Sequence, residues 1–331
     1  MTNPRTDVVA IGNAIVDVIA SATTQFLSEI GIEKGSMRLI SAEEATELYS
    51  KMGPGQEVSG GSAANTLAGL AALGHRCTFI GQVADDQLGE VFVHDMRATG
   101  IACDVPPRPG PPPTARCLIL VAPDGERTMN TSLAAAHYLP ESAIDESMIA
   151  NAEYLLIEGY LWDPPQPRAA IIKAMGFAKA SGCKIVFALS ALYLMGLYRE
   201  DFITLIDDGM IDVLFCNEEE VLALVPDTAF EDVIAQLSAK VPTLVVTRAE
   251  HGAMAVQGGE RAEVPAEAIA RVVDTTGAGD TFTSGFLAGQ LQGRSLKDSL
   301  TMGAVCAAEC IGHIGPRPQA DLKALVSARL G

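Results

Sequence analysis

Positive charge is scarce in this 331-residue chain, which carries 23 Lys and Arg against 41 Asp and Glu, for a formal net charge of -18. Nucleic-acid binding depends on cations that neutralise phosphates, so this balance argues against DNA or RNA as a partner. It also disfavours binding to an anionic membrane surface. A phosphate site in such a chain must rely on backbone dipoles, metal ions and a few local cations.

Paired cysteines and long apolar runs are also missing. The seven cysteines include no Cys-x-x-Cys spacing, and their odd number does not fit a disulfide framework. Cys306 and Cys310 stand one helical turn apart, but no histidine or carboxylate cluster completes a metal site, so we expect buried structural thiols. The polar stretch Met1–Asp7 lacks the features of a signal peptide, and no run is long enough to span a bilayer. We therefore expect a cytoplasmic protein.

Two common nucleotide-binding motifs are absent. No Gly-x-Gly-x-x-Gly follows the first predicted strand, which disfavours a dehydrogenase, and no Gly-Lys-Ser/Thr occurs, which disfavours a Walker-type NTPase. The sequence also contains no internal repeat. Hydrophobic residues make up 48% of the chain and charged residues 19%, a globular composition with enough apolar material for a large core.

Compact apolar segments alternate with helix-forming segments along the chain. The predicted strands are Val8–Gly12, Cys77–Val83, Tyr154–Glu158, Lys184–Leu189, Val213–Cys216 and Thr243–Thr247. The predicted helices are Ser41–Lys51, Ser62–Leu73, Gln87–Thr99, Arg168–Ser181, Phe230–Ala239 and Asp280–Gln292. Almost continuously hydrophobic strands that alternate with helices indicate a parallel sheet covered on both faces. The predicted fold class is a doubly wound α/β domain with a mostly parallel sheet.

Two regions depart from this rhythm. Ala14–Ala20 and Arg116–Val121 alternate apolar with polar residues, which predicts strands with one solvated or ligand-facing side. The second follows Val105–Pro113, whose prolines indicate an extended connector. A small β-sheet lid inserted into the main domain accounts for both regions. We expect a single domain over 1–331, with lid strands contributed approximately by 13–40 and 102–132.

The segment 274–287 carries the strongest chemical signal and reads DTTGAGDTFTSGFL. Gly277 and Gly279 let the backbone turn sharply and bring its N–H groups close to a ligand, and the helix beginning near Asp280 adds the positive end of its dipole. A carboxylate at such an anion hole is well placed to accept the proton of a hydroxyl that attacks phosphorus. Taken alone, the pattern is also typical of a glycine turn with Asp280 as helix N-cap.

A second segment, 60–74, reads GGSAANTLAGLAALG. Its glycine pair opens a predicted helix that Gly74 closes. Asn65 is the one amide in this helix and faces the side where Gly60 and Gly61 leave room for a ligand. A tightly packed core helix with a solvated asparagine is the alternative interpretation of this segment alone.

Together the two segments resemble the two hallmark motifs of the PfkB (ribokinase-like) family of carbohydrate and nucleoside kinases, in the order and separation found in that family. The resemblance covers essentially the whole chain. It implies that Asp280 is the catalytic base, and that the amides of Gly277, Ala278 and Gly279 stabilise charge on the γ-phosphate of ATP. A non-catalytic nucleotide-binding protein of the same fold is disfavoured because Asp280 and the Gly-Ala-Gly triplet are present.

The resemblance also implies sites for nucleotide and metal. Asn217 and Glu220 reproduce the family's Asn-x-x-Glu and imply a Mg²⁺ site reached through water. Without that context, Glu220 is an ordinary first-turn carboxylate of a helix. Thr247 and Gly252 correspond to the family's nucleotide-binding strand and loop, so ATP contacts are implied at Asn217, Thr247, Gly252, Gly277 and Gly279. A K⁺ site near the anion hole is implied at the backbone of Asp274, Thr276 and Gly315.

For the acceptor, the segment 12–17 (GNAIVD) resembles the family's opening strand, whose aspartate binds vicinal hydroxyls of a sugar ring. Asp17 as a hairpin-turn residue is the alternative. Arg127 resembles an arginine that reaches the transferring phosphate, and a solvated turn arginine is equally compatible with the sequence. The implied acceptor-binding residues are Asn13, Asp17, Gly60, Gly61, Asn65, Arg127, Ala135 and Tyr160.

The segment 125–137, GERTMNTSLAAAH, is similar to the matching part of adenosine kinases, and Glu158–Trp162 offers cover for a purine. This implies transfer to the 5′-hydroxyl of an adenosine-like nucleoside. Four residues differ from those expected in an adenosine kinase, namely Met37, Arg38, Ser132 and His137. The alternative is a PfkB sugar kinase acting on ribose, fructose or a keto-deoxy sugar acid, although an acidic sugar would require extra cations at the site mouth. The sequence leaves open whether the protein is a monomer or a homodimer.

Overall fold

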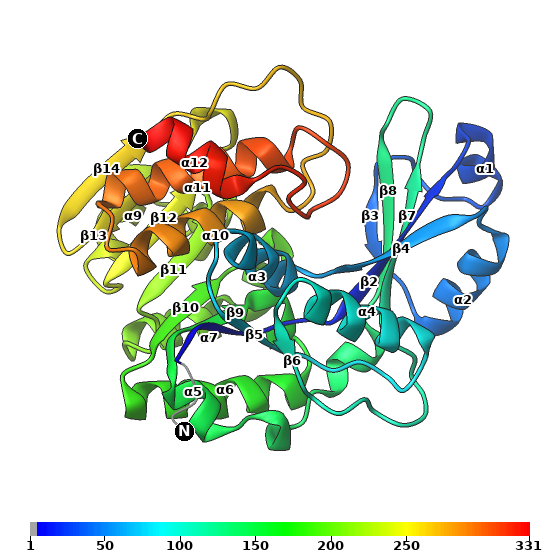
Figure 1. Cartoon of the computed structure of the whole chain (residues 1–331), viewed down its shortest axis with the longest axis horizontal. Coiled ribbons are helices and arrows are strands. Elements are labelled where there is room, and N and C mark those ends of the chain that lie inside the picture. Colours follow the sequence, from blue (N-terminus) through cyan, green and yellow to red (C-terminus); the bar gives the residue numbers. More distant parts are fainter. Residues whose placement is uncertain (1–4) are drawn as a thin grey trace.

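The computed structural model describes residues 5–331, and its described part contains a nine-stranded sheet in the order β14-β13-β12-β11-β10-β9-β1-β5-β6 (Figure 1). In this order, the seven strands from β12 to β6 pair in parallel with their neighbours. At the opposite edge, β13 pairs antiparallel with both β12 and β14. The strands are β1 (Thr6–Ile11), β5 (Cys77–Ile80), β6 (Ala102–Cys103), β9 (Ala152–Glu158), β10 (Lys184–Ala188), β11 (Val213–Asn217), β12 (Thr243–Thr247), β13 (Ala253–Gln257) and β14 (Glu260–Val264). The predicted mostly parallel α/β fold is confirmed.

Helices cover both faces of this sheet, as Figure 1 shows. Along β1, Val8 and Ala10 belong to a core that includes α3 and α10, whereas Val9 and Ile11 belong to a second core that includes α6 and α7. A strand buried on both faces must be hydrophobic at every position, which is why these strands were visible in the sequence. The helices are α1 (Thr24–Glu29), α2 (Ala42–Lys51), α3 (Ser62–Ala72), α4 (Gln87–Ala98), α5 (Glu146–Ala150), α6 (Pro165–Ser181), α7 (Leu192–Asp207), α8 (Glu218–Leu224), α9 (Phe230–Ser238), α10 (Ala278–Leu291), α11 (Leu296–Cys310) and α12 (Leu322–Leu330).

A second, five-stranded sheet stands beside the main one, on the right in Figure 1. Its order is β3-β8-β7-β2-β4, with β2 (Ile15–Ser21), β3 (Met37–Leu39), β4 (Gly55–Gly60), β7 (Ala115–Val121) and β8 (Arg127–Ser132). Four of these strands fall in the ranges expected for the lid. The ranges differ from the structure in two places: β4 lies outside them, and β6, at 102–103, pairs with β5 in the main sheet.

The chain crosses between the two sheets at residues of the segments 12–17 and 60–74. β1 leads through Gly12 and Asn13 directly into lid strand β2, and lid strand β4 leads through Gly61 into α3. Gly61 has a φ of 95°, and a side chain there would overlap the carbonyl of Asn13. Only glycine therefore lets the two crossings lie side by side.

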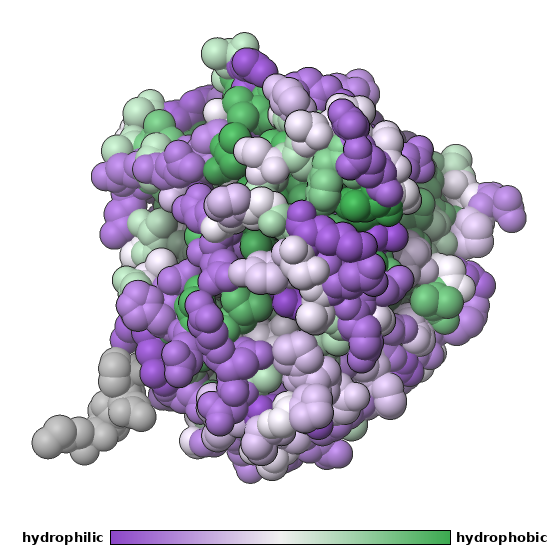
Figure 2. Space-filling model, turned by 90° about the vertical axis from the view of Figure 1, so that its right-hand side faces the viewer, coloured by the Kyte–Doolittle hydropathy of each residue, from purple (hydrophilic) through white to green (hydrophobic). Residues whose placement is uncertain are grey.

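All seven cysteines are buried and carry free thiols, as predicted. Residues 1–4 of the N-terminal stretch Met1–Asp7, which we expect not to be a signal peptide, lie outside the described residues. Among the helices of residues 5–331, none is both long and apolar enough to cross a membrane. Seen from the lid side, the surface is mostly hydrophilic with several hydrophobic patches (Figure 2).

Candidate active site

A pocket of about 370 Å³ lies between the two sheets. Its floor comes from the carboxyl ends of main-sheet strands and the N-termini of α3 and α10, and its opposite wall comes from the lid. Ligand sites of open α/β sheets lie at such strand ends. Of the implied site residues, the pocket is lined by Asn13, Asp17, Gly61, Asn65, Tyr160, Asn217, Glu220, Thr247, Thr276, Gly277, Ala278, Gly279 and Asp280.

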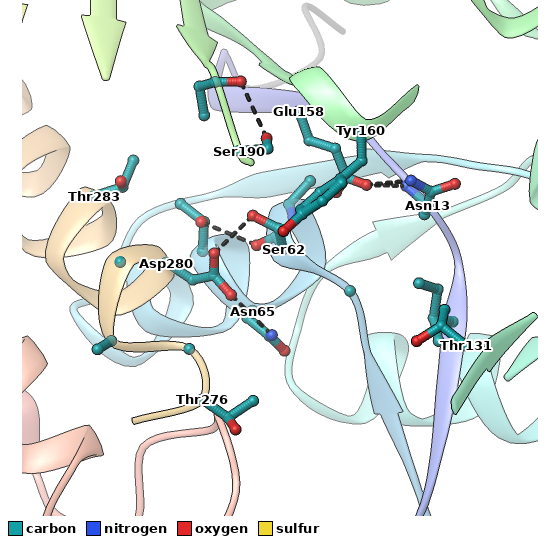
Figure 3. Close-up of a pocket in the computed structure, with 18 of the residues that line it drawn as sticks. Asn13, Ser62, Asn65, Thr131, Glu158, Tyr160, Ser190, Thr276, Asp280 and Thr283 are labelled. Carbon is teal, nitrogen blue, oxygen red and sulfur yellow. Dashed lines mark hydrogen bonds between the residues drawn. The ribbon is translucent and has the colours of Figure 1, made fainter. Parts of the chain in front are cut away.

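Asp280 lies on the first turn of α10 and points into this pocket (Figure 3). The N-cap of α10 is Gly277, with a φ of 77°, so Asp280 is not the cap. Its two carboxylate oxygens instead accept hydrogen bonds from the hydroxyl of Ser62 at 2.6 Å and the side-chain amide of Asn65 at 3.0 Å. The segments 60–74 and 274–287 therefore meet at one carboxylate.

The surroundings of Asp280 act on its pKa in both directions. Burial raises the pKa above its ordinary value, while the hydrogen bonds from Ser62 and Asn65 and the charge of Arg317 lower it in part. A raised pKa makes the carboxylate a stronger proton acceptor, provided that it remains ionised. The site is suited to removing a proton from a hydroxyl group.

The backbone before Asp280 forms a tight turn against the segment that follows α11. The amide of Ala278 donates to the carbonyl of Thr275 at 3.2 Å, which differs from the expectation that it faces a ligand. The amides of Gly279 and Asp280 lie in the first turn of a 14-residue helix, where N–H groups have no intrahelical partner. First-turn amides and a helix dipole favour an anion in general, and phosphate binding at this turn stays a prediction.

Asp274 connects this turn to the lid. Its carboxylate accepts hydrogen bonds from the amides of Thr276 at 3.1 Å and Gly315 at 2.8 Å. It also forms an ion pair at 2.9 Å with Arg127, which begins lid strand β8, and the side chains of Asp274 and Arg127 are only 4% and 8% exposed. Arg127 is thus neither a solvated turn residue nor part of the pocket lining.

The three residues implied for K⁺ lie together around this carboxylate. The thiol of Cys310 is 3.4 Å from the carbonyl oxygen of Thr276 and 4.0 Å from that of Gly315, so both carbonyls face the same small region. Whether a cation binds there stays a prediction.

On the acceptor side, Asp17 of β2 lines the pocket and is only 7% exposed. Burial raises its pKa to about 7, while Arg317 and Arg127 act in the opposite direction. A side chain at Gly60 would overlap both carboxylate oxygens of Asp17. Gly60 therefore serves this site by making room for Asp17, and it does not itself line the pocket.

Glu158, at the end of β9, is a buried carboxylate that the sequence showed only as part of a covering segment. It accepts hydrogen bonds from the amide of Asn13 at 2.9 Å, the side chain of Asn13 at 2.5 Å and the amide of Ala63 at 2.9 Å (Figure 3). Burial raises its pKa to about 7. This network turns the side-chain oxygen of Asn13 away from Glu158, and that buried oxygen has no partner among the described residues.

Asn217 and Glu220 lie where β11 ends and α8 begins. The side chain of Asn217 accepts from the amide of Glu220 at 2.8 Å, and the carboxylate of Glu220 accepts from the amide of Asn217 at 3.0 Å. This reciprocal pair is a helix capping box. No cluster of three His, Cys, Asp or Glu side chains suited to a metal occurs within residues 5–331. The donor set fits a magnesium ion held mainly by water and phosphate oxygens.

Gly252 and Ala135 also lie outside the pocket lining. Gly252 closes the turn between β12 and β13 at a φ of 85°, where a side chain would overlap the carbonyl of Val264. Ala135 is fully buried in a short 3-10 helix, with its amide bound to the carbonyl of Pro113. Direct ligand contacts by these two residues stay predictions.

Arg317 belongs to none of the sequence motifs. It lies in the loop between α11 and α12, and its guanidinium donates to the side-chain oxygen of Asn65 at 3.1 Å and to Ser59 at 3.0 Å. Burial lowers its pKa to about 10, so it stays a cation at neutral pH. An isolated arginine in a loop carries no pattern that would mark it in a single sequence.

The model of the pfkB family of carbohydrate kinases matches residues 6–322. The chain belongs to this family. It is accordingly a kinase, and the resemblance seen in the two motifs is confirmed across nearly the whole chain.

Relatives of this pfkB-family chain differ in acceptor. The structure of an adenosine kinase from Sinorhizobium meliloti is 45% identical, covers 98% of this chain and 99% of that one, and has a TM-score of 0.90. A probable sugar kinase from Rhizobium etli is 43% identical, covers 99% of both chains and has a TM-score of 0.91. The 5-dehydro-2-deoxygluconokinase of Shouchella clausii is 29% identical over 91% of this chain and 88% of that protein.

Proposed function

We propose that this kinase transfers the γ-phosphoryl group of ATP to the 5′-hydroxyl of an adenosine-like nucleoside. In this reaction the acceptor hydroxyl lies against Asp280, which takes its proton as the oxygen attacks phosphorus. Ser62 and Asn65 hold both oxygens of the carboxylate during that step. ATP with Mg²⁺ supplies the activated phosphoryl group, and the first-turn amides of α10 are placed to bind its oxygens.

The observation that carries the choice of acceptor is the charge of the pocket lining. Within residues 5–331, no Lys, Arg or His lines the pocket, whereas four carboxylates do: Asp17, Glu158, Glu220 and Asp280. An acceptor that bears its own carboxylate or phosphate would meet no cation in this lining and would be repelled by those carboxyls that are ionised. A neutral acceptor with several hydroxyl groups is favoured over a sugar acid or a sugar phosphate.

The lid wall favours a nucleoside over a small neutral sugar. Met37 and Leu39 on edge strand β3 line the pocket together with Met129 on β8, and Arg38 between them binds Asn130 instead. Met37 and Leu39 are 57% and 55% exposed, so a ligand beneath the lid can cover apolar surface there. Tyr160 lines the same pocket from the main-sheet side. A flat apolar base fits between these groups, whereas a free sugar would leave them uncovered.

The hydroxyl-binding side fits a ribose ring. Asp17 offers two acceptor oxygens to vicinal hydroxyls, and the unpartnered side-chain oxygen of Asn13 accepts one more. Asp17 and Asn13 would bind the hydroxyls of free ribose equally well, so they support only an acceptor with a hydroxylated ring. The preference for a nucleoside over ribose rests on the apolar lid residues.

The test is an acceptor panel with ATP and Mg²⁺ in which kcat/KM is measured for adenosine, inosine, guanosine, ribose, fructose and 2-keto-3-deoxygluconate. Adenosine is expected to be the best acceptor, and the sugar acid the poorest because of the carboxylates. An Asp280→Asn preparation, purified in parallel, controls for contaminating kinases. A free sugar that exceeds adenosine by an order of magnitude would overturn the nucleoside assignment while leaving the kinase assignment intact.

A further inference from the structure

The side chain of Arg317 reaches the catalytic region from a loop that none of the recognised motifs includes. Its Nε donates to Oδ1 of Asn65 at 3.1 Å, and its Nη2 donates to the carbonyl and hydroxyl oxygens of Ser59, both at 3.0 Å. Ser59 belongs to lid strand β4 and Asn65 to α3. One guanidinium thus spans the junction between the lid and the helix that contacts Asp280.

The contact with Asn65 decides which way that amide points. A side-chain amide has an acceptor oxygen on one side and a donor nitrogen on the other, and a guanidinium can only donate. Arg317 therefore requires the oxygen of Asn65 to face it, which leaves Nδ2 to donate to Oδ2 of Asp280 at 3.0 Å. The reversed amide would place its oxygen against the carboxylate and its nitrogen against the guanidinium, and both contacts would be repulsive.

We propose that Arg317 is a positioning residue that orients Asn65 and, through it, holds the carboxylate of Asp280 in the direction and ionisation state needed for proton removal. This inference rests on the proposed phosphoryl transfer with Asp280 as base. It assigns to Arg317 no contact with either substrate.

Two further contacts of the same loop support this role. The amide of Gly315 donates to Asp274 at 2.8 Å, and Pro316 lies where a side chain at Gly277 would be, so that the turn before Asp280 packs directly on it. Residues 315–317 thus contact three parts of the segment 274–287: its first residue Asp274, its first glycine Gly277 and, through Asn65, the carboxylate of Asp280.

The pKa of Asp280 should respond strongly to a change in the contacts among Arg317, Asn65 and Asp280, because other charged groups lie nearby. The carboxyls of Asp17 on β2 and Glu158 on β9 and the carboxylate of Asp280 disfavour each other's negative charge. Tyr160, in the 3-10 helix after β9, stays a neutral phenol because burial and the charge of Asp280 raise its pKa. Arg317 is the cation that acts on Asp280, and it is itself flanked by Asp17 and Asp95. If the guanidinium of Arg317 and the oriented amide of Asn65 are removed, two of the groups that lower the pKa of Asp280 are lost, while its burial and the nearby carboxyls remain. The pKa of Asp280 should therefore rise.

The first experiment compares Arg317→Met and Arg317→Lys with the wild type, using whichever acceptor the wild type phosphorylates. Arg317→Met is expected to lower kcat roughly 10- to 100-fold with less than about a threefold change in acceptor KM, and to move the acidic limb of the kcat profile to higher pH. Arg317→Lys should lie between, because an ammonium keeps the charge but not the fork that spans Asn65 and Ser59. Arg76→Met, which removes an exposed arginine paired with Asp7, is the matched control and should behave as wild type.

A double-mutant cycle distinguishes an effect of Arg317 that reaches Asp280 through Asn65, here called the relay, from a general loss of packing. In an Asn65→Leu background, Arg317→Met should lower kcat by no more than about threefold further, because the route to Asp280 is already broken. Fully additive losses would contradict the relay. If Arg317→Met does not fold, Arg317→Lys carries the test, and a folded Arg317→Lys variant with wild-type kcat and pH profile would also contradict it.

A second measurement is independent of any acceptor. Carboxyl ¹³C NMR of protein labelled at aspartate, with Asp280 assigned through Asp280→Asn, gives the pKa of this residue directly. The pKa should rise in Arg317→Met and stay unchanged in Arg76→Met. An unchanged Asp280 pKa overturns the inference, even if the acceptor panel supports the kinase reaction. Absence of activity with every acceptor would count against the proposed function, and the NMR result would still decide the role of Arg317.

Discussion

The two sheets contribute different chemistry to one pocket. The main-sheet side brings helix N-termini, backbone amides and the carboxylates Glu158, Glu220 and Asp280, all fixed on elements with buried faces. Within the described part of the chain, the lid brings methionine and leucine side chains and one carboxylate, Asp17. In the proposed reaction, the groups that act on the phosphoryl group belong to the larger and better-buried framework, and the smaller sheet would recognise the acceptor.

The largest effect should come from the main-sheet side. Replacement of Asp280 by Asn should lower kcat roughly 10²- to 10⁴-fold, because the general base is lost while the amides that bind phosphate remain. Steady-state kinetics together with an ATP-binding titration would measure both expectations. Asp298→Asn is a matched control, since Asp298 is a half-buried first-turn aspartate of the next helix, α11, and does not line the pocket. Wild-type turnover in Asp280→Asn would remove the base assignment.

A lid substitution should change selectivity more than turnover. If Asp17 binds the ribose hydroxyls, the wild type should phosphorylate adenosine much faster than 2′-deoxyadenosine, and Asp17→Ala should reduce that ratio by roughly 10- to 100-fold. The measurement is kcat/KM for the two nucleosides in both proteins. A ratio that does not change in Asp17→Ala would show that recognition of the hydroxyls lies elsewhere.

Asp17 also predicts a pH dependence of stability. Its folded pKa of about 7 lies above the ordinary value of 3.8, so between these values the folded state binds more protons than the unfolded state, and its stability falls as pH rises. Asp17→Asn removes this loss and should raise Tm relative to wild type at pH 8 but not at pH 4. Thermal denaturation at the two pH values measures the difference, and a Tm difference independent of pH would contradict it.

The contact between the two regions can be broken directly. Arg127→Met leaves the buried carboxylate of Asp274 without its lid partner, which should destabilise the protein by about 3–5 kcal/mol. Denaturant unfolding measures this loss. Arg38→Met, which removes an arginine from the neighbouring lid strand, is the control and should cost less than about 1.5 kcal/mol. If Arg127→Met and Arg38→Met lower the free energy of unfolding equally, the ion pair between Arg127 and Asp274 does not stabilise the contact between lid and main sheet.

The smallest expected effect concerns the metal. Glutamine at position 220 can still form the capping box with Asn217, so Glu220→Gln should fold normally and raise the Mg²⁺ concentration needed for half-maximal rate by roughly two- to tenfold. Acceptor KM should not change. Rates measured over a magnesium titration check this, and an unchanged titration would assign Glu220 to helix capping alone.

Strands with continuous hydrophobic runs and helices with a clear helical period or composition could be predicted from the sequence, whereas elements without such a local pattern could not. The six predicted strands of the main sheet and the six predicted helices all occur, with ends shifted by a few residues. Strand β4 reads GQEVSG, which has little strand propensity, and it forms because it pairs along β2. Helix α11 was not predicted because buried residues occur on nearly every side of it, so it has little amphipathic period.

The sequence by itself determined the fold class, the family and the candidate base, because each depends on local pattern: buried strands, helix periodicity and the runs at 60–74 and 274–287. Only the tertiary structure decided which groups surround that base. Asn65 and Asp280 are 215 residues apart in the chain, and Arg317 and Asn65 are 252 apart. Contacts over such separations leave no local periodicity, so Arg317, Glu158 and the pairing of Asp274 with Arg127 emerged only when the chain was folded.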